Sequence, residues 1–298
     1  MRKKIIVGSR DSRLAVAQTK LVMEKIKQAD PELELELVTM KTTGDKILDK
    51  TLDKIGGKGL FVKELDKALI DRKVDITVHS LKDMPMEGNP DLPLLAFAER
   101  GNPYDCIVLP ENVPSEEIRM DLPVGSSSGR RNTQLKDIIK GIKQAPVRGN
   151  VITRLEKLDR GDFSALILAR AGLERIGLEN RISRTFTEDE MVPAAGQGIL
   201  VIQGRKDEDY SWLMPADHKE TRIAALCERA FVTTLDGGCS APIGAFAKIR
   251  DNRLVLTGFY ENTETGKYGK LTGESDIDEY EKLGVSLAHK IKEKVDNE

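Results

Sequence analysis

The sequence predicts an α/β protein that ends in a small α+β domain, and three observations lead to this prediction. Over the first two-thirds of the chain, short apolar segments alternate with polar loops and amphipathic helical patterns, which is typical of a mainly parallel sheet covered by helices. Near the carboxyl end, three strand-like segments follow one another between two helices, which indicates an antiparallel sheet. The length of 298 residues favours two or three domains.

The first elements have clear periodicities. Residues 4–10 (KIIVGSR) predict a strand, and the apolar positions from 14 to 26 share one helical face. Leucines alternate with glutamates in residues 31–40, which predicts a half-buried strand. Residues 61–69 have helical spacing, and a strand is expected at 74–80 (VDITVHS). The same order of strand and loop recurs in four later segments, at 122–131, 145–154, 164–177 and 198–205.

The carboxyl-terminal part has a different order of elements. A helical pattern at 221–235 leads into a glycine-rich loop, DGGCSAPIG, at 236–244. Strands are expected at 244–250, 253–262 and 266–273, joined by polar turns, one of which contains Asp251 and Asn252. A final amphipathic helix completes an α+β domain with a three-stranded antiparallel sheet.

Composition excludes several classes of protein. Hydrophobic residues make up 39% and charged residues 32% of the chain, as in a globular protein, and the formal net charge of −2 gives no general attraction to nucleic acid. No apolar run approaches the ~20 residues that span a bilayer, and the amino terminus lacks a signal-peptide core. We therefore expect a cytoplasmic protein without nucleic-acid or membrane partners.

The three cysteines are Cys106, Cys227 and Cys239. Their odd number and the absence of a Cys-x-x-Cys spacing argue against a disulfide framework, and with only three histidines no metal site is expected. Cys106 and Cys227 lie in apolar patterns that predict core positions. Cys239 lies between two glycines and a Ser-Ala-Pro segment, which favours an accessible thiol on a loop.

Arginines and hydroxyl side chains cluster where the predicted strands end. Ser9 and Arg10, then Ser126 to Ser128 with Arg130 and Arg131, follow strands directly, and several of these residues fall in the first turn of a predicted helix. Cations are unfavourable there because the helix dipole is already positive at that end. Ligands of open α/β sheets bind at the carboxyl ends of strands, so the pattern predicts a polyanionic ligand rich in carboxylates or phosphates. The glycine-containing segments GGKGLF and GQGILVIQG do not fit nucleotide-binding motifs.

Two other residues near a strand end are candidates for catalytic roles. Asp83, in HSLKDMP, is an acid among cationic loops, and its local sequence fits a structural role, as a helix cap or turn residue, as well as a functional one. His79 and Cys239 together are candidates for a hydrolase dyad, although no third orienting group is identifiable. A protein that only binds an anion, without any covalent adduct, is the remaining alternative.

A family resemblance distinguishes these alternatives. The segments VGSRDSRLAVAQ, TTGDK, GGKGLFVKELD, VHSLKDMP, GSSSGRR, VRGNVITRLEKLDRG, VPAAGQG, LCERAF and LDGGCSAPIG occur in the order seen in the porphobilinogen deaminases (hydroxymethylbilane synthases), which the chain resembles over nearly its whole length. The resemblance implies a transferase that joins four porphobilinogen molecules, with loss of ammonia, and releases linear hydroxymethylbilane. It also implies a dipyrromethane cofactor, made from substrate and bound through a thioether to the cysteine that matches Cys239.

The resemblance implies roles for further residues. Asp83 matches the catalytic aspartate, whose carboxylate stabilises positive charge on a pyrrole nitrogen and helps to move protons. Contacts to cofactor or substrate carboxylates are implied for Arg10, Ser12, Lys82, Ser126, Ser128, Arg130, Arg131, Arg148, Arg154, Arg175 and Gln197. The segment around Lys54, Lys58 and Phe61 resembles a mobile lid of the family.

The resemblance further implies a monomer with three domains, two of them similar to the lobes of periplasmic solute-binding proteins. We expect domain 1 at residues 1–98 and 197–217, domain 2 at 99–196 and domain 3, with the cofactor cysteine, at 218–298. The chain departs from the family at Gly129, where leucine is common, so the resemblance does not imply the backbone conformation around Arg130.

Overall fold

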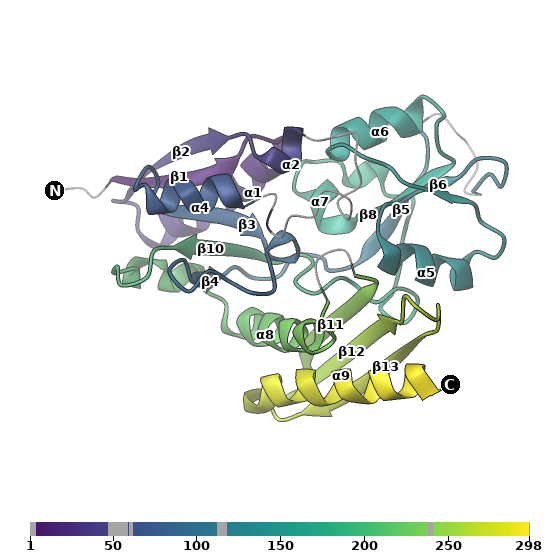
Figure 1. The fold of residues 1–298 in the computed structure, drawn as a ribbon. Helices are drawn as coiled ribbons and strands as arrows, with labels where there is room; N and C mark the ends of the chain where they lie inside the picture. The colour runs from purple at the N-terminus through teal and green to yellow at the C-terminus, as the bar shows by residue number, and fades with distance from the viewer. Residues whose placement is uncertain (1–3, 47–58, 60–61, 112–117, 238–240, 298) are drawn as a thin grey trace. The chain divides into compact units, whose positions relative to one another are not determined.

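The computed structural model describes residues 4–46, 59, 62–111, 118–237 and 241–297. The chain forms two compact units, one built from Met1–Gly101 and Gly198–Ile223 and the other from Asn102–Gln197 and Ala224–Glu298 (Figure 1). The boundaries of the three expected domains stay a prediction.

The first unit contains a five-stranded sheet in the order β2-β1-β3-β10-β4. Its strands are β1 (Lys4–Arg10), β2 (Glu34–Met40), β3 (Ile76–Ser80), β4 (Leu94–Phe97) and β10 (Leu200–Gly204). The helices of this unit are α1 (Arg13–Ala29), α2 (Thr43–Lys46) and α4 (Lys63–Ile70), with 3₁₀ turns η1 (Leu81–Asp83) and η3 (Ser211–Ala216). Ser12 begins α1 by accepting a hydrogen bond from the Ala15 amide, and the helix buries Val22 and Ile26 in the core of this sheet.

The second unit contains a sheet in the order β7-β6-β8-β5-β9. Its strands are β5 (Asp105–Val108), β6 (Val124–Gly125), β7 (Gln144–Ala145), β8 (Ala165–Ala169) and β9 (Arg184–Thr185). The helices that accompany it are α5 (Gly129–Ile138), α6 (Val151–Asp159) and α7 (Arg170–Glu174), with the 3₁₀ turn η2 (Glu179–Arg181). Asn150 caps α6 through its side chain, and Leu155 and Leu158 on that helix are buried.

Both five-stranded sheets are mixed, whereas the sequence predicted mainly parallel ones. In the first unit β1 pairs in parallel with β2 and β3, but β10 is antiparallel to β3 and β4. In the second, β6 is parallel to β7 and β8, and β5 is antiparallel to β8 and β9. The antiparallel strands β5 and β10 each follow a passage of the chain from one unit to the other, so no crossover helix fixes their direction.

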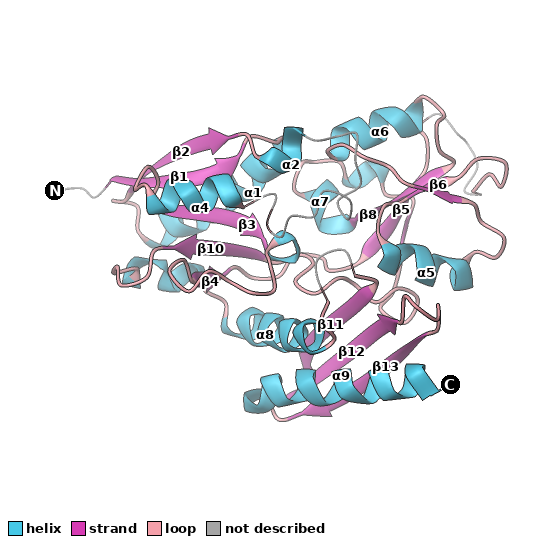
Figure 2. Ribbon diagram, in the orientation of Figure 1, coloured by secondary structure: helices cyan, strands magenta, loops and turns pink. Residues whose placement is uncertain are grey.

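The predicted three-stranded antiparallel sheet is confirmed. It consists of β11 (Ile243–Arg250), β12 (Arg253–Glu261) and β13 (Tyr268–Ser275), accompanied by α8 (Lys219–Thr234), η4 (Ile277–Glu279) and α9 (Tyr280–Asn297). Asp251 and Asn252 form the two-residue turn with φ values of 49° and 59°, and positive φ at both positions matches the twist of the paired strands. Helix α9 runs along β12 and β13 (Figure 2) and buries Leu287 and Ile291. The α/β class with an α+β end is therefore confirmed.

Candidate active site

The first unit gathers several predicted residues at one edge of its sheet. Strands β1 and β3 are parallel neighbours, so Arg10 at the end of β1 and Ser80 at the end of β3 reach the same edge. Lys82 and Asp83 follow immediately, in η1. Ser12 uses its Oγ as the acceptor that caps α1, and its hydroxyl hydrogen has no acceptor among the described residues.

Asp83 is half-buried at the last position of η1. Within the described part of the chain its carboxylate makes no hydrogen bond or ion pair, unlike Asp75 in the same unit, which accepts from the Ile6 amide at 2.8 Å. An aspartate without an internal partner is available to a substrate. The alternative is that Asp83 caps a helix or stabilises a turn through its side chain. This would need a hydrogen bond from a backbone amide to the Asp83 carboxylate, and the described residues provide none.

His79 is buried on β3, next to this edge. Its Nε2 atom lies 2.9 Å from Thr77 Oγ1. Burial lowers its pKa to about 4. A hydrogen bond that the ring donates to Gln203 opposes this shift, and the charge of Arg10 adds to it. A ring with such a pKa is a weak base at neutral pH, which argues against a dyad with Cys239.

The buried His79 should make the stability of the protein depend on pH. The unfolded chain binds a proton near pH 6.5 and the folded protein only near pH 4, so the free energy of unfolding falls as the pH is lowered through this range. We expect His79 to lower it by about 2 kcal/mol at pH 5 relative to pH 8. Urea unfolding at both pH values should show that His79→Gln removes this difference, whereas His289→Gln, at an exposed position of α9, does not. Equal pH dependence of the wild type and His79→Gln would contradict the assignment.

The second unit places its predicted residues at the corresponding edge. Strands β6 and β8 are parallel and end at Gly125 and Ala169, and β5 begins at this edge because Asp105 pairs with Ala169. Ser126 follows β6 directly, and Ser128 caps α5 by accepting from the Arg131 amide at 3.5 Å. The strand-end pattern therefore brings Arg10 and Ser80 of the first unit, and Ser126 and Ser128 of the second, to one edge of the sheet in their own unit.

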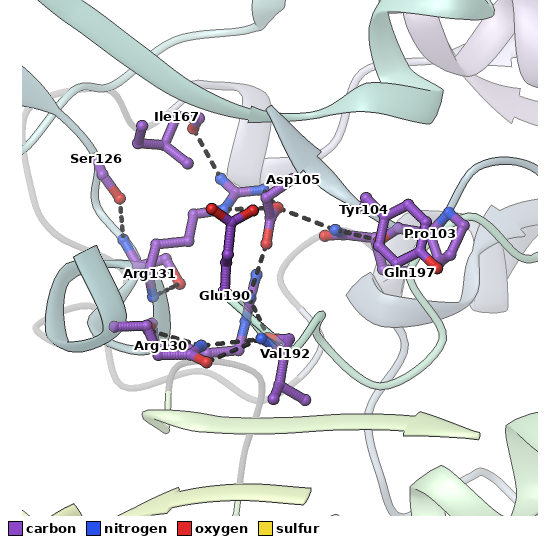
Figure 3. Close-up of polar contacts among 12 residues, drawn as sticks. Pro103, Tyr104, Asp105, Ser126, Arg130, Arg131, Ile167, Glu190, Val192 and Gln197 are labelled. Carbon is purple, nitrogen blue, oxygen red and sulfur yellow. Dashed lines mark hydrogen bonds and ion pairs between the residues drawn. The ribbon is translucent and has the colours of Figure 1, made fainter. Parts of the chain in front are cut away.

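Arg130 and Arg131 are buried and share one carboxylate, that of Asp105 (Figure 3). Arg130 Nη1 donates to Asp105 Oδ2 at 2.7 Å and to the Val192 carbonyl at 2.7 Å. Arg131 donates to Asp105 Oδ1 from Nε at 2.9 Å and from Nη2 at 2.7 Å. Gln197 adds a bond from Nε2 to the same oxygen at 2.9 Å, and its other amide hydrogen goes to the Pro103 carbonyl.

This arrangement fixes the charges of the cluster. Burial by itself would raise the pKa of Asp105, but the guanidinium groups of Arg130 and Arg131 outweigh it and hold that pKa far below its usual range. Burial also lowers the pKa of Arg130, opposed by the charge of Asp105. Arg130 still carries its charge at neutral pH because a guanidinium starts from so high a value.

The remaining predicted arginines lie along the same unit. Arg154, on α6, donates from Nε to the Gly149 carbonyl at 2.8 Å. Arg148 precedes α6 in the loop that Ser127 holds through Val147, where the Ser127 hydroxyl both donates to the carbonyl and accepts from the amide. Arg175 ends α7, and burial lowers its pKa to about 10.

Two carboxylates that the sequence did not identify organise this unit. Asp105 stands at the start of an apolar strand segment, DCIV, and a charge in such a run is the signal that could have identified it. Glu228, on α8, is fully buried and accepts from the amides of Gly196 and Ala247, each at 2.7 Å. It thereby joins the segment that carries Gln197 to strand β11.

Gly129, the departure from the family pattern, has a structural reason. As the first residue of α5 it packs on Pro242, so that a Cβ at position 129 would lie 3.3 Å from Pro242 Cβ. Position 242 is three residues after Cys239 in the chain. The start of the arginine-bearing helix therefore lies against the segment that follows the predicted cofactor cysteine.

A side chain at position 129 should strain this contact. Overpacking of this kind costs about 2 kcal/mol, so Gly129→Leu should lower the free energy of unfolding by that amount, and Gly129→Ala by less. Urea unfolding measures both. In a Pro242→Gly background, where the opposing Cβ is absent, Gly129→Leu should cost less; an unchanged cost in that background would show that the strain arises elsewhere.

Two of the three cysteines lie in the core, as the sequence predicts. Cys106 and Cys227 are free and buried, and burial raises the pKa of each thiol to about 12, which makes both unreactive. Cys239 lies outside the described residues, as do Lys54, Lys58 and Phe61 of the expected lid. Among the residues that the structure does describe, no cluster of acidic, cysteine or histidine side chains could hold a metal ion, and no helix has the length and apolar character needed to cross a membrane.

Comparisons with known proteins cover both units. Two family models match the chain: "Porphobilinogen deaminase, dipyromethane cofactor binding domain" over residues 5–211, and "Porphobilinogen deaminase, C-terminal domain" over residues 222–293. The porphobilinogen deaminase of Ruminiclostridium josui is 53% identical over 290 residues, which cover 97% of this chain and 98% of that protein. That of Acetivibrio thermocellus is 54% identical over 285 residues, covering 96% and 97%. A solved structure of a probable amino-acid ABC transporter extracellular-binding protein from Bacillus subtilis aligns with 13% identity and a TM-score of 0.39, over 71% of this chain and 88% of that one.

Proposed function

Since the chain belongs to the porphobilinogen deaminase family, we propose that Cys239 carries its dipyrromethane cofactor and that Asp83 is its catalytic carboxylate. The enzyme is a transferase of tetrapyrrole biosynthesis, which deaminates porphobilinogen and assembles hydroxymethylbilane.

The packing of Gly129 on Pro242 carries the assignment of Cys239. It brings the chain just after the cysteine to the start of α5, where Arg130 and Arg131 follow. A dipyrromethane bears acetate and propionate groups, and guanidinium groups are the donors that bind carboxylates in pairs. Since the other two thiols are buried and protonated, they do not compete for the thioether.

The donor set at the sheet edges fits such a cofactor. We assign carboxylate binding to the guanidinium, ammonium, hydroxyl and amide groups named from the family pattern: Arg10, Ser12, Lys82, Ser126, Ser128, Arg130, Arg131, Arg148, Arg154, Arg175 and Gln197. When bound, the cofactor supplies the pyrrole carbon to which substrate is added. Ser12 and Ser128 cap their helices through Oγ, and within the part of the chain that the structure describes neither hydroxyl hydrogen has an acceptor. Both can therefore donate to a ligand carboxylate without loss of the cap.

Asp83 acts on the substrate ring in this proposal. Its carboxylate, without an internal partner among the described residues, stabilises the positive charge on the pyrrole nitrogen after ammonia has left and accepts or returns protons at the ring. Lys54, Lys58 and Phe61 are assigned to a lid that excludes water during this step. We further propose that the enzyme is cytoplasmic and that it works as a monomer. Sedimentation of the purified protein tests the monomeric state.

The test of the proposal is the intact mass of freshly purified protein. We expect a mass above that of the sequence by one dipyrromethane unit, located on the peptide that contains Cys239. An active protein with the unmodified mass would refute the covalent cofactor.

A further inference from the structure

The Asp105 cluster has more positive than negative charge. Asp105 is fully buried, and Arg130 and Arg131 are only 3% and 8% exposed. One carboxylate thus faces two guanidinium groups, and the three side chains together have a formal charge of +1. An excess charge in a buried place is costly unless an anion joins it.

The two arginines use different edges toward Asp105. Arg131 presents its Nε–Nη2 edge, with both nitrogens on Asp105 Oδ1, and gives an Nη1 hydrogen to the Ile167 carbonyl at 3.0 Å. Arg130 uses Nη1 alone, for Asp105 and Val192. Within the described part of the chain, the Nε–Nη2 edge of Arg130 has no partner. This edge has the parallel pair of N–H groups that matches a carboxylate.

We propose that Asp105 is a positioning residue that divides the roles of the two arginines: it occupies the paired edge of Arg131 and leaves that of Arg130 for a ligand carboxylate. The inference rests on the proposed function, since it specifies which arginine clamps the cofactor or the growing pyrrole chain. Arg130 makes the bidentate contact, whereas Arg131, whose paired edge is occupied, orients the cluster and gives a ligand carboxylate at most a single hydrogen bond.

Asp105 is well held for this task. It is the first residue of β5, paired with Ala169, and its carbonyl accepts from the Phe186 amide at 3.0 Å. Its carboxylate accepts four N–H groups, from Arg130 Nη1, Arg131 Nε and Nη2, and Gln197 Nε2. If Asp105 moved away, the buried guanidinium groups of Arg130 and Arg131 would lose their counter-charge. We therefore expect Asp105 to keep its contacts when a ligand binds.

A comparison of lysine variants tests the division. Arg130→Lys keeps one cationic group for Asp105 but loses the paired edge, so the KM for porphobilinogen should rise at least tenfold. Arg131→Lys loses the two bonds to Asp105 Oδ1, so the melting temperature should fall by about 5 °C or more with a smaller change in KM. Melting temperatures are compared in a Cys239→Ser background, so that cofactor loading does not differ between variants. Equal effects of the two lysine substitutions on both quantities would overturn the proposal.

A change of Asp105 itself gives the second arm. In Asp105→Asn the fraction of enzyme with cofactor should fall. The KM of the loaded fraction should rise at least tenfold, with kcat changed less than threefold. Asp105→Glu keeps the carboxylate, so its KM should lie between those of Asp105→Asn and the wild type. Asp162→Asn, at an exposed pair with Arg160, is the matched control. A folded Asp105→Asn enzyme with normal KM and loading would refute positioning, and if it fails to fold, the lysine pair decides. A wild type without adduct refutes the cofactor assignment, but the difference in melting temperature can still be measured.

Discussion

Replacement of Cys239 by serine is expected to give a protein with the mass of its sequence and no detectable formation of hydroxymethylbilane. A thiolate adds readily to the electrophilic carbon left when a pyrrole loses its amino group, whereas a serine hydroxyl without an activating base does not. Intact-protein mass spectrometry and a product assay, both on freshly purified material, provide the measurement.

The same variant contains its own control. Cys106 and Cys227 remain as thiols, both buried with pKa values near 12, so loss of the adduct identifies Cys239 as its site. An adduct of one dipyrromethane unit on Cys239→Ser, or normal turnover without one, would contradict the assignment.

Asp83→Asn is expected to retain the adduct and to lose activity by a factor of about 10² to 10⁴ in kcat, the usual contribution of a positioned acid or base. The amide has nearly the same shape as the carboxylate but neither stabilises a cation as a negative charge does nor accepts a proton. Single-turnover kinetics of the loaded enzyme with porphobilinogen measure the loss.

Asp91→Asn provides the comparison for Asp83→Asn. Asp91 is exposed in the same unit, eight positions farther along the chain, and its substitution should leave kcat within twofold of the wild type. A loaded Asp83→Asn enzyme with a normal rate would remove Asp83 from the chemistry.

These two variants separate two stages of the reaction cycle. Cys239→Ser abolishes the attachment of the cofactor, and Asp83→Asn the use of the loaded enzyme. The arginine cluster affects both stages, because the same carboxylate groups occur on the cofactor and on the substrate. Loading and KM should therefore change together in the Asp105 and Arg130 variants, whereas Asp83→Asn should change neither.

The local sequence determined much of this protein. Apolar periodicity predicted most of the strands and helices, although not β4, β9 or α2. Asp251 and Asn252 marked the turn between β11 and β12, and Cys106 and Cys227 were correctly assigned to the core. The positions of Arg10, Ser126 and Arg130 just after strands also predicted a common edge in each sheet, since parallel strands end together.

Tertiary structure alone decided the partners and the strand directions. Strands β5 and β10 are antiparallel to a neighbour because the chain enters each sheet from the other unit, and strand periodicity is the same in either direction. Asp105 meets Arg130 and Arg131 across about 25 residues of chain, and Glu228 meets Gly196 and Ala247 over similar separations. Periodicity reports which side of an element faces the core, but it contains no information on which distant charge completes a buried cluster. That is set by the folded arrangement, in which a buried charge is tolerated only beside its counter-charge and hydrogen-bond donors.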